Sequence, residues 1–425
     1  SDLPVAVQCG PAAPGAAGMA TGTRAGSGRQ DTVTQEKATG PLKGIRVIDM
    51  TQFILGPVAT QIMGDMGADI IKVEAPVGDQ NRHIGPGPCE GMAALFLGMN
   101  RNKRSVMLDL KKPAARELLF RMIERADVFA HSLRPDAAER LGVHYAAIQA
   151  RNPKIVYASA PGYRSDGPQK NRPAYDDVIQ GESGIADMNL RASGKPRYMP
   201  TVIADKFCGH VLASSIAMAL VHRERTGEGQ AVEVPMLETM LSFNLIEHLW
   251  VRQFDPAGAI GYDRALMATR RPFATRDGHI CLMVTTDAQW QRLFAALERP
   301  DLAADPRFAT VQSRSQCFEE LYGLVEQSLA HRTTGEWRAV LDKADVPNSA
   351  AKRLADLPED PYLVQTGFFH HYRHPVAGDL VTPSIPVKYS ATPGTIHSPP
   401  PLLGEHTGEV LAEFGFSAAE IDAAT

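Results

Sequence analysis

Five short apolar runs, interspersed with helical stretches, follow one another in the first half of the chain. They are GIRVIDM (44–50), DIIKVE (69–74), SVMLDL (105–110), DVFAHS (127–132) and KIVYASA (154–160). Apolar runs of this length, rich in Val and Ile, are typical of strands buried on both faces. Strands that alternate with helices at this spacing predict an α/β fold with a parallel sheet covered by helices on both sides.

The helical stretches have apolar positions at helical spacing. The first opens at Gly56-Pro57 and covers 58–68, and a long one covers about 205–224 before the Gly-containing stop TGEG (226–229). The segment 112–126 is expected to bury one face, made of Leu118, Leu119, Met122 and Ile123. The long helix is expected to bury Ile216, Ala217, Leu220 and Val221.

The composition changes at both ends of this region. Residues 1–40 are rich in Gly, Ala, Pro, Ser and Thr without apolar periodicity, so we expect a disordered leader. After about 250, the pattern predicts a strand at 279–285 and helices at 287–298, at 314–331 and from 334 onward. These elements predict a smaller α+β domain. Seven prolines between 375 and 401 favour extended chain, followed by a short helix over 408–415.

Charge and cysteine content restrict the function. The 425 residues include 44 Lys and Arg against 48 Asp and Glu, so no overall basic field favours nucleic acid or an anionic membrane as partner. The five cysteines show neither CxxC nor zinc spacing, which predicts reduced thiols in a cytoplasmic protein and no metal site. Charges or Gly interrupt the apolar stretches, so we expect no membrane span.

Motifs for phosphate loops, dinucleotides, zinc proteases and serine hydrolases are absent from the sequence. A basic cluster, Asn100–Arg104, precedes the third predicted strand, Lys111 and Lys112 follow that strand, and Arg140 lies on a nearby helical turn. Clustered cations beside a sheet edge suit a phosphate-bearing ligand, although a solvated surface turn has the same composition.

Asp205 opens the long predicted helix and permits two interpretations. As an N-cap it would satisfy a free backbone N–H group. As a nucleophile it would use the same position, because a helix N-terminus favours an ionised carboxylate. Asp176 and Asp177, which follow Tyr175, are equally ambiguous because acidic residues often begin helices.

Seven segments in order resemble the class III CoA-transferase family, the CaiB/BaiF group. They are 41–74, NRNKRSVMLDL (100–110), LRPDAAERLG (133–142), PGYRSDGP (161–168), PAYDDVIQGESG (173–184), 204–230 and PLLGEHTGEVL (401–411). The resemblance implies a Rossmann-like large domain over 41–245 that is completed by a returning segment over 366–425. It also implies a smaller inserted domain with linkers over 246–365, and an interlocked homodimer.

The resemblance implies an enzyme that moves CoA from an acyl-CoA thioester to a carboxylic acid. The family nucleophile matches Asp205, which would form an acyl-aspartyl anhydride and then an aspartyl-CoA thioester. CoA is then a substrate, and no tightly bound cofactor is implied. The resemblance places CoA contacts at eight positions: Gln52, Phe53, Asn102, Lys103, Arg104, Lys111, Arg140 and Tyr175.

Some positions depart from the formyl-CoA:oxalate members of the family. Ile54 and Ala75 stand where those enzymes carry Gln and a CoA-binding Arg, and 256–259 lacks their four glycines. An oxalate and formate specificity is therefore not expected. The stretch that contains Arg264, Arg270 and Arg271 supplies either a clamp for the acid or structural contacts.

Two other functions are compatible with these residues. The α-methylacyl-CoA racemases resemble this chain at both acidic motifs, but they carry His where Tyr175 stands. A phenol would need a strongly depressed pKa to act as a base near neutrality, so the transferase is favoured. A CoA-thioester-binding protein without catalysis would use Asp205 only as a cap.

Overall fold

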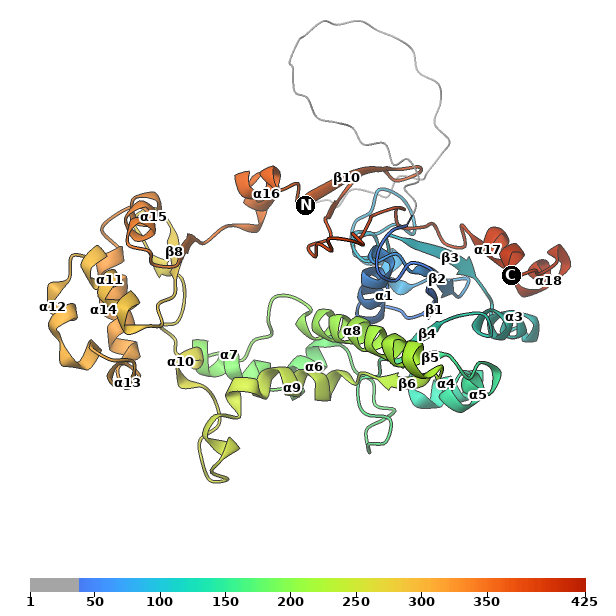
Figure 1. Ribbon diagram of the computed structural model, residues 1–425, viewed down its shortest axis with the longest axis horizontal. Coiled ribbons are helices and arrows are strands. Elements are labelled where there is room, and N and C mark those ends of the chain that lie inside the picture. Colours follow the sequence, from blue (N-terminus) through green and yellow to red (C-terminus); the bar gives the residue numbers. More distant parts are fainter. Residues whose placement is uncertain (1–37) are drawn as a thin grey trace, which may run out of the picture. The chain divides into compact units, whose positions relative to one another are not determined.

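The computed structural model describes residues 38–425 (Figure 1). All but the last three residues of the expected leader lie outside the described residues. The chain divides into two compact units. The first combines the described residues up to Ile179 with Thr201–Met240 and Val364–Thr425, and the second combines Gln180–Pro200 with Leu241–Leu363.

A six-stranded parallel sheet forms the centre of the first unit, in the order β3-β2-β1-β4-β5-β6. Its strands are β1 (Arg46–Met50), β2 (Asp69–Glu74), β3 (Lys103–Met107), β4 (Val128–His131), β5 (Val156–Ser159) and β6 (Gln230–Glu233). The first five confirm the predicted strands and the parallel α/β sheet, whereas β6 was not predicted. The strand order reverses between β1 and β4, the position at which open α/β sheets bind ligands.

Helices cover both faces of this sheet. On one face, α1 (Leu55–Asp65) packs against α8 (Ile203–Thr226). Gly209 permits this close approach, because a Cβ atom there would lie 2.7 Å from the Leu55 carbonyl oxygen. On the opposite face lie α3 (Pro113–Ile123), α5 (Tyr145–Arg151), α17 (Thr407–Glu413) and α18 (Ala418–Ala424). The predicted apolar face of α3 is buried there, as expected.

Two expectations about the long helix are corrected. In the described part of the chain, α8 is the one helix long and apolar enough to span a membrane by length and composition. The expectation that charges or Gly break every apolar stretch is therefore wrong for α8, which continues through Gly209. Ile216 and Leu220 are buried as predicted, whereas Val221 is 49% exposed rather than buried.

The C-terminal segment of the first unit runs beside the start of β3. After the hairpin of β10 (Phe369–His374) and β11 (Gly378–Pro383), the chain is extended through its prolines, as predicted. Arg101 Nη1 donates to Thr382 Oγ1 at 2.8 Å. Asn102 Oδ1 accepts hydrogen bonds from two backbone N–H groups of the extended segment, at 2.8 and 3.0 Å. These contacts fix the tail on β3.

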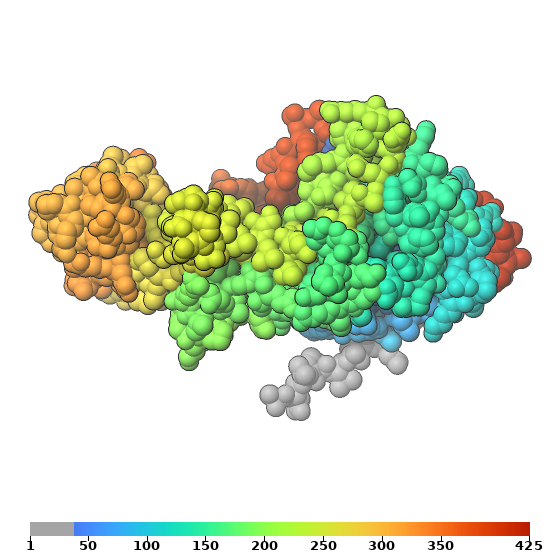
Figure 2. All heavy atoms as spheres, turned by 90° about the horizontal axis from the view of Figure 1, so that it is seen from below, coloured from blue at the N-terminus to red at the C-terminus, as the bar shows by residue number. Residues whose placement is uncertain are grey.

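The second unit has its own core around the buried Trp290, made of residues between Phe273 and Val346. Most of this part of the chain is the orange body in Figure 2. Its strands are β7 (Phe273–Ala274), β8 (His279–Leu282) and β9 (Asn348–Ala350), paired antiparallel. Its helices include α7 (Ile185–Ser193), α10 (Asp263–Leu266), α11 (Asp287–Ala296), α12 (Pro300–Ala304), α13 (Val311–Arg314), α14 (Phe318–Leu329) and α15 (Thr334–Lys343). α9 (Met236–His248) includes residues of both units.

Candidate active site

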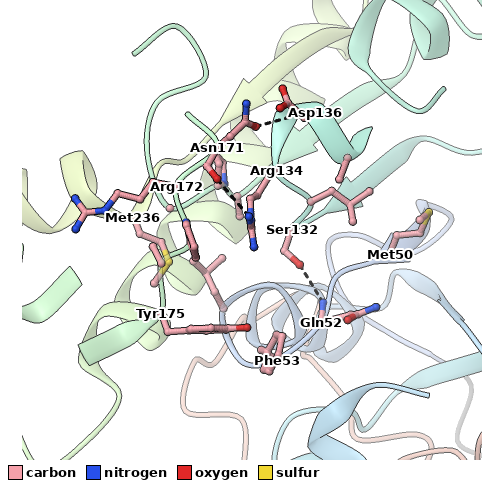
Figure 3. Close-up of a pocket in the computed structure, with 18 of the residues that line it drawn as sticks. Met50, Gln52, Phe53, Ser132, Arg134, Asp136, Asn171, Arg172, Tyr175 and Met236 are labelled. Atoms are coloured by element: carbon pink, nitrogen blue, oxygen red, sulfur yellow. Dashed lines mark hydrogen bonds between the residues drawn. The ribbon is translucent and has the colours of Figure 1, made fainter. Parts of the chain in front are cut away.

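A pocket of about 440 Å³ lies at the carboxyl ends of β1, β4 and β5, beside the reversal of strand order (Figure 3). Every residue that lines it belongs to the first unit. The lining brings together five predicted site residues: Gln52, Phe53, Arg140, Tyr175 and Asp205. The loops that follow parallel strands all lie at the same edge of the sheet. Residues far apart in the sequence therefore meet in this pocket.

The turn after β1 forms one wall of the pocket. The Gln52 N–H donates to Ser132 Oγ at 3.1 Å, which ties this turn to the end of β4. Phe53 adopts a left-handed conformation with φ of 62°, which is uncommon for a residue with a side chain. Its ring meets the Tyr175 ring edge-on, with centroids 5.2 Å apart. Phe53 is therefore placed directly against Tyr175, another predicted site residue.

Asp205 is the third residue of α8 and not its N-cap. The capping position is Val202, whose side chain makes no capping bond. The Asp205 N–H instead donates to Asp176 Oδ1 at 3.1 Å, from the first turn of α6 (Asp176–Glu182). The interpretation of Asp205 as the cap is therefore wrong, because Asp176 supplies the acceptor. Asp177, the neighbouring carboxylate, is exposed.

The carboxylate of Asp205 is poorly hydrated and lacks a cation. It lies half-buried in the pocket wall, and it accepts no hydrogen bond from the described residues. Burial, and then the negative charge of Asp176, raise the pKa of Asp205 to about 7. A carboxyl group shifted by desolvation and a charged neighbour, in a cleft, is characteristic of a reactive group rather than a structural ion pair.

Arginines surround the open side of the pocket. Arg140, at the end of α4 (Pro135–Leu141), and Arg134 and Arg172 are all exposed lining residues. Figure 3 shows the Arg172 guanidinium directed away from the pocket, and its Nη1 donates to Gln169 Oε1 at 3.1 Å. Arg134 Nη1 donates to the Asn171 carbonyl at 3.3 Å, which leaves most of its donors available. Guanidinium groups bind phosphates by charge-assisted hydrogen bonds, so Arg134 and Arg140 suit a phosphorylated ligand. The sequence interpretation missed Arg134, which lies inside the motif 133–142, and Arg172, which directly precedes the motif 173–184.

The basic cluster before β3 does not enter the pocket. Lys103 is 1% exposed, and its Nζ lies 3.4 Å from Asp49 Oδ2 and donates to the Pro57 carbonyl at 3.0 Å. Burial lowers the pKa of Lys103 to about 8 despite the charge of Asp49. Arg104 forms an ion pair with Asp69 at 2.8 Å. These contacts are internal to the first unit.

The expected phosphate contacts of this cluster therefore need correction. β3 begins at Lys103, two residues before the predicted strand, so Lys103 and Arg104 lie in a strand and not in a surface turn. The Asn102 side chain is committed to the C-terminal segment. We assign these three residues to the stability of the fold. Lys111 is exposed beyond β3 and does not line the pocket, so its contact with CoA stays a prediction.

Two of the arginines proposed as an acid clamp have partners within the second unit. Arg264 Nη2 donates to the Tyr322 hydroxyl at 2.7 Å, and its guanidinium stacks on Phe318. Arg271 forms an ion pair with Glu326 at 3.1 Å. Both observations favour the structural alternative for Arg264 and Arg271.

The resemblance described above implies acyl-CoA as the substrate. Arg140→Ala is then expected to raise KM for acyl-CoA about tenfold or more, because a charge-assisted hydrogen bond contributes about 1.5–3 kcal/mol. The kcat should change less than about twofold, since an interaction that binds substrate and transition state equally affects KM alone. Steady-state kinetics with Arg225→Ala as control check this, because Arg225 is equally exposed at the far end of α8. An unchanged KM would exclude Arg140 from the binding site.

The family model for CoA-transferase family III matches residues 42–407. A probable fatty acyl-CoA transferase of Mycobacterium tuberculosis is 33% identical over 387 residues, covering 88% of this chain and 98% of the relative. The acetyl-CoA:oxalate CoA-transferase of Acetobacter aceti is 33% identical over 398 residues, covering 91% and 99%. The crystal structure of a CAIB/BAIF family protein from Brucella suis superposes with a TM-score of 0.75, at 29% identity and with 88% and 100% covered. Because the family model and these relatives span nearly the whole described chain, this protein belongs to CoA-transferase family III and is a transferase enzyme.

Proposed function

We propose that this enzyme transfers CoA from an acyl-CoA thioester to a carboxylic acid, with Asp205 as the nucleophile. The observation that carries the proposal is the Asp205 carboxylate, which is half-buried and without a cation in a pocket bordered by exposed arginines. A structural carboxylate at this depth would be expected to have a paired cation. Membership of the family supports CoA transfer as the reaction.

The first half of the reaction converts the donor into an enzyme-bound thioester. A carboxylate oxygen of Asp205 attacks the thioester carbonyl carbon, the C–S bond breaks, and CoA leaves as a thiolate. The product is an acyl-aspartyl anhydride. The thiolate then attacks the aspartyl carbonyl carbon, which releases the donor acid as a carboxylate and leaves an aspartyl-CoA thioester. Two easier steps thus replace one difficult exchange, and no proton is consumed.

The second half repeats these steps with the acceptor. Its carboxylate attacks the aspartyl carbonyl and expels the CoA thiolate, and the resulting mixed anhydride is attacked by that thiolate at the acceptor carbon. The new acyl-CoA leaves, and Asp205 is again a carboxylate. Apolar side chains such as Met50, Phe53 and Met236 line the pocket, and they would limit the access of water to the anhydride.

An exchange assay tests this function against the alternatives. The relatives above carry names that refer to fatty acyl-CoA, acetyl-CoA and oxalate, so the panel should combine acyl-CoA donors with mono- and dicarboxylic acids. Mass spectrometry should detect a new acyl-CoA that appears only when an acceptor acid is present. Epimerisation of a chiral 2-methylacyl-CoA without an acceptor would indicate a racemase. Binding without either reaction would indicate the non-catalytic alternative.

We further propose an interlocked homodimer in the cytoplasm, with residues 246–365, which make up most of the second unit, as the inserted small domain. Exposed apolar side chains on α8, such as Met218 at 67%, support an assembly that covers them. The four described cysteines are free thiols, which is compatible with a reducing compartment. Light scattering over a dilution series should give a constant dimer mass. A folded monomer at low concentration would contradict the interlocked arrangement.

A further inference from the structure

We propose that Lys72, Asp79 and Asn81 are positioning residues that hold the turn after β1 in the conformation that catalysis requires. The inference rests on the proposed function, since it concerns the same pocket. Gln52 and Phe53 of this turn line the pocket, whereas the three positioning residues do not. All three are almost completely buried behind it.

The three side chains bind the backbone of the turn at successive points. Lys72 Nζ donates to the Thr51 carbonyl at 2.9 Å. Asp79 Oδ1 accepts from the Phe53 N–H at 3.3 Å, and the Asn81 amide donates to the Phe53 carbonyl. The N–H and the carbonyl of Phe53 are thus bonded to two side chains of one short loop, Asp79 and Asn81, while Lys72 of β2 holds the turn two residues earlier, at Thr51.

This arrangement explains how Phe53 keeps its left-handed backbone. A side chain at φ of 62° is disfavoured, and such a conformation persists only where its surroundings determine it. With both peptide groups of Phe53 fixed, its ring is directed against Tyr175 in the pocket wall. Release of either bond would allow the backbone to rotate to a common conformation and would move the ring away.

The positioning residues are themselves rigidly held. Lys72 Nζ pairs with Asp79 Oδ2 at 2.9 Å, and both side chains are fully buried. The Asp79 N–H donates to Glu74 Oε2 at 3.0 Å, and Glu74 pairs with the buried Arg82 at 2.7 Å. Apolar residues of similar volume often stabilise a fold as well as a buried ion pair does. The placement of these charges on a pocket turn therefore favours a positioning role.

Asn81→Ala in the full-length protein tests the inference. We expect kcat for CoA exchange to fall about tenfold or more while KM for acyl-CoA changes less than about threefold, because misplacing a pocket wall affects the reacting geometry. Asn152→Ala is the matched control, since Asn152 Nδ2 also donates to backbone carbonyls, of Ile123 and Ala126, far from the pocket lining. The melting temperature of Asn152→Ala should fall, whereas its kcat should equal that of the wild type.

Two further measurements separate positioning from simple stability. In a Phe53→Gly background, where glycine tolerates positive φ and the ring is absent, Asn81→Ala should have little further effect on kcat. A crystal structure of Asn81→Ala should show Phe53 outside the left-handed region. An unchanged turn, or wild-type kcat in Asn81→Ala, would overturn this inference. Lack of CoA exchange by the wild-type enzyme would overturn the proposed function instead. In that case the crystal structure of Asn81→Ala would still test whether the positioning residues hold the turn.

Discussion

Asp205→Asn is expected to abolish CoA exchange and to stabilise the protein above pH 7. The amide cannot attack a thioester, so no anhydride forms. Burial, followed by the charge of Asp176, raises the pKa of Asp205 from 3.8 to about 7. The folded state therefore binds this proton more tightly than the unfolded state, and stability is lost as the pH rises from about 4 to about 7. At higher pH the ionised carboxylate costs on the order of 4 kcal/mol, which the neutral amide avoids.

Urea unfolding of the wild type and of Asp205→Asn, each at pH 4 and pH 8, measures this change in stability. The free energy of unfolding of Asp205→Asn should exceed that of the wild type by a large amount at pH 8 and by a small amount at pH 4. Asp177→Asn is the control, because the Asp177 carboxylate is exposed. The free energy of unfolding of this variant should match that of the wild type at both pH values. Retention of exchange by Asp205→Asn would show that the carboxylate is not the nucleophile. If Asp205→Asn were less stable than the wild type at pH 8, the Asp205 carboxylate would have a stabilising partner, which would contradict the environment described above.

Lys103→Ala is expected to destabilise the fold by about 3–5 kcal/mol, as does removal of one partner from a buried ion pair. The Asp49 carboxylate, completely buried beside Lys103, would lose a cation, and the Pro57 carbonyl would lose its donor. Urea unfolding should detect this loss, and Lys154→Ala, which removes an exposed lysine, should change stability by less than about 0.5 kcal/mol. Normal stability combined with a raised KM for acyl-CoA would return Lys103 to phosphate binding.

The sheet could be predicted because its central strands contain short apolar runs rich in Val, Ile and Ala that are buried in the first unit. β6 was missed because it lies at the edge, where QAVE alternates between half-buried and exposed positions and carries two polar residues. The start of β3 was misplaced for a related reason. Its cations are neutralised by Asp49 and Asp69, which are 54 and 35 residues away in the chain, and sequence spacing cannot show such pairs.

The candidate site was only partly predictable. Asp205 and Tyr175 were predicted from their motifs. Arg134 lies in the motif 133–142 without a signal of its own, Arg172 is a single arginine in a loop, and only the sheet topology brings their loops together. Asp176 was ambiguous because its bond to the Asp205 N–H spans 29 residues. The contacts of Lys72 and Asn81 with the turn after β1 are likewise tertiary, and neither residue carries a sequence signal of its own.

The most direct test of the central claim is mass spectrometry of the peptide that contains Asp205, after incubation of the enzyme with an acyl-CoA donor alone. The peptide should carry an acyl or CoA mass that hydroxylamine removes, because both the anhydride and the thioester are activated acyl groups. The corresponding peptide of Asp205→Asn should stay unmodified. An adduct on a different residue, or rapid exchange without any adduct on Asp205, would contradict Asp205 as the nucleophile.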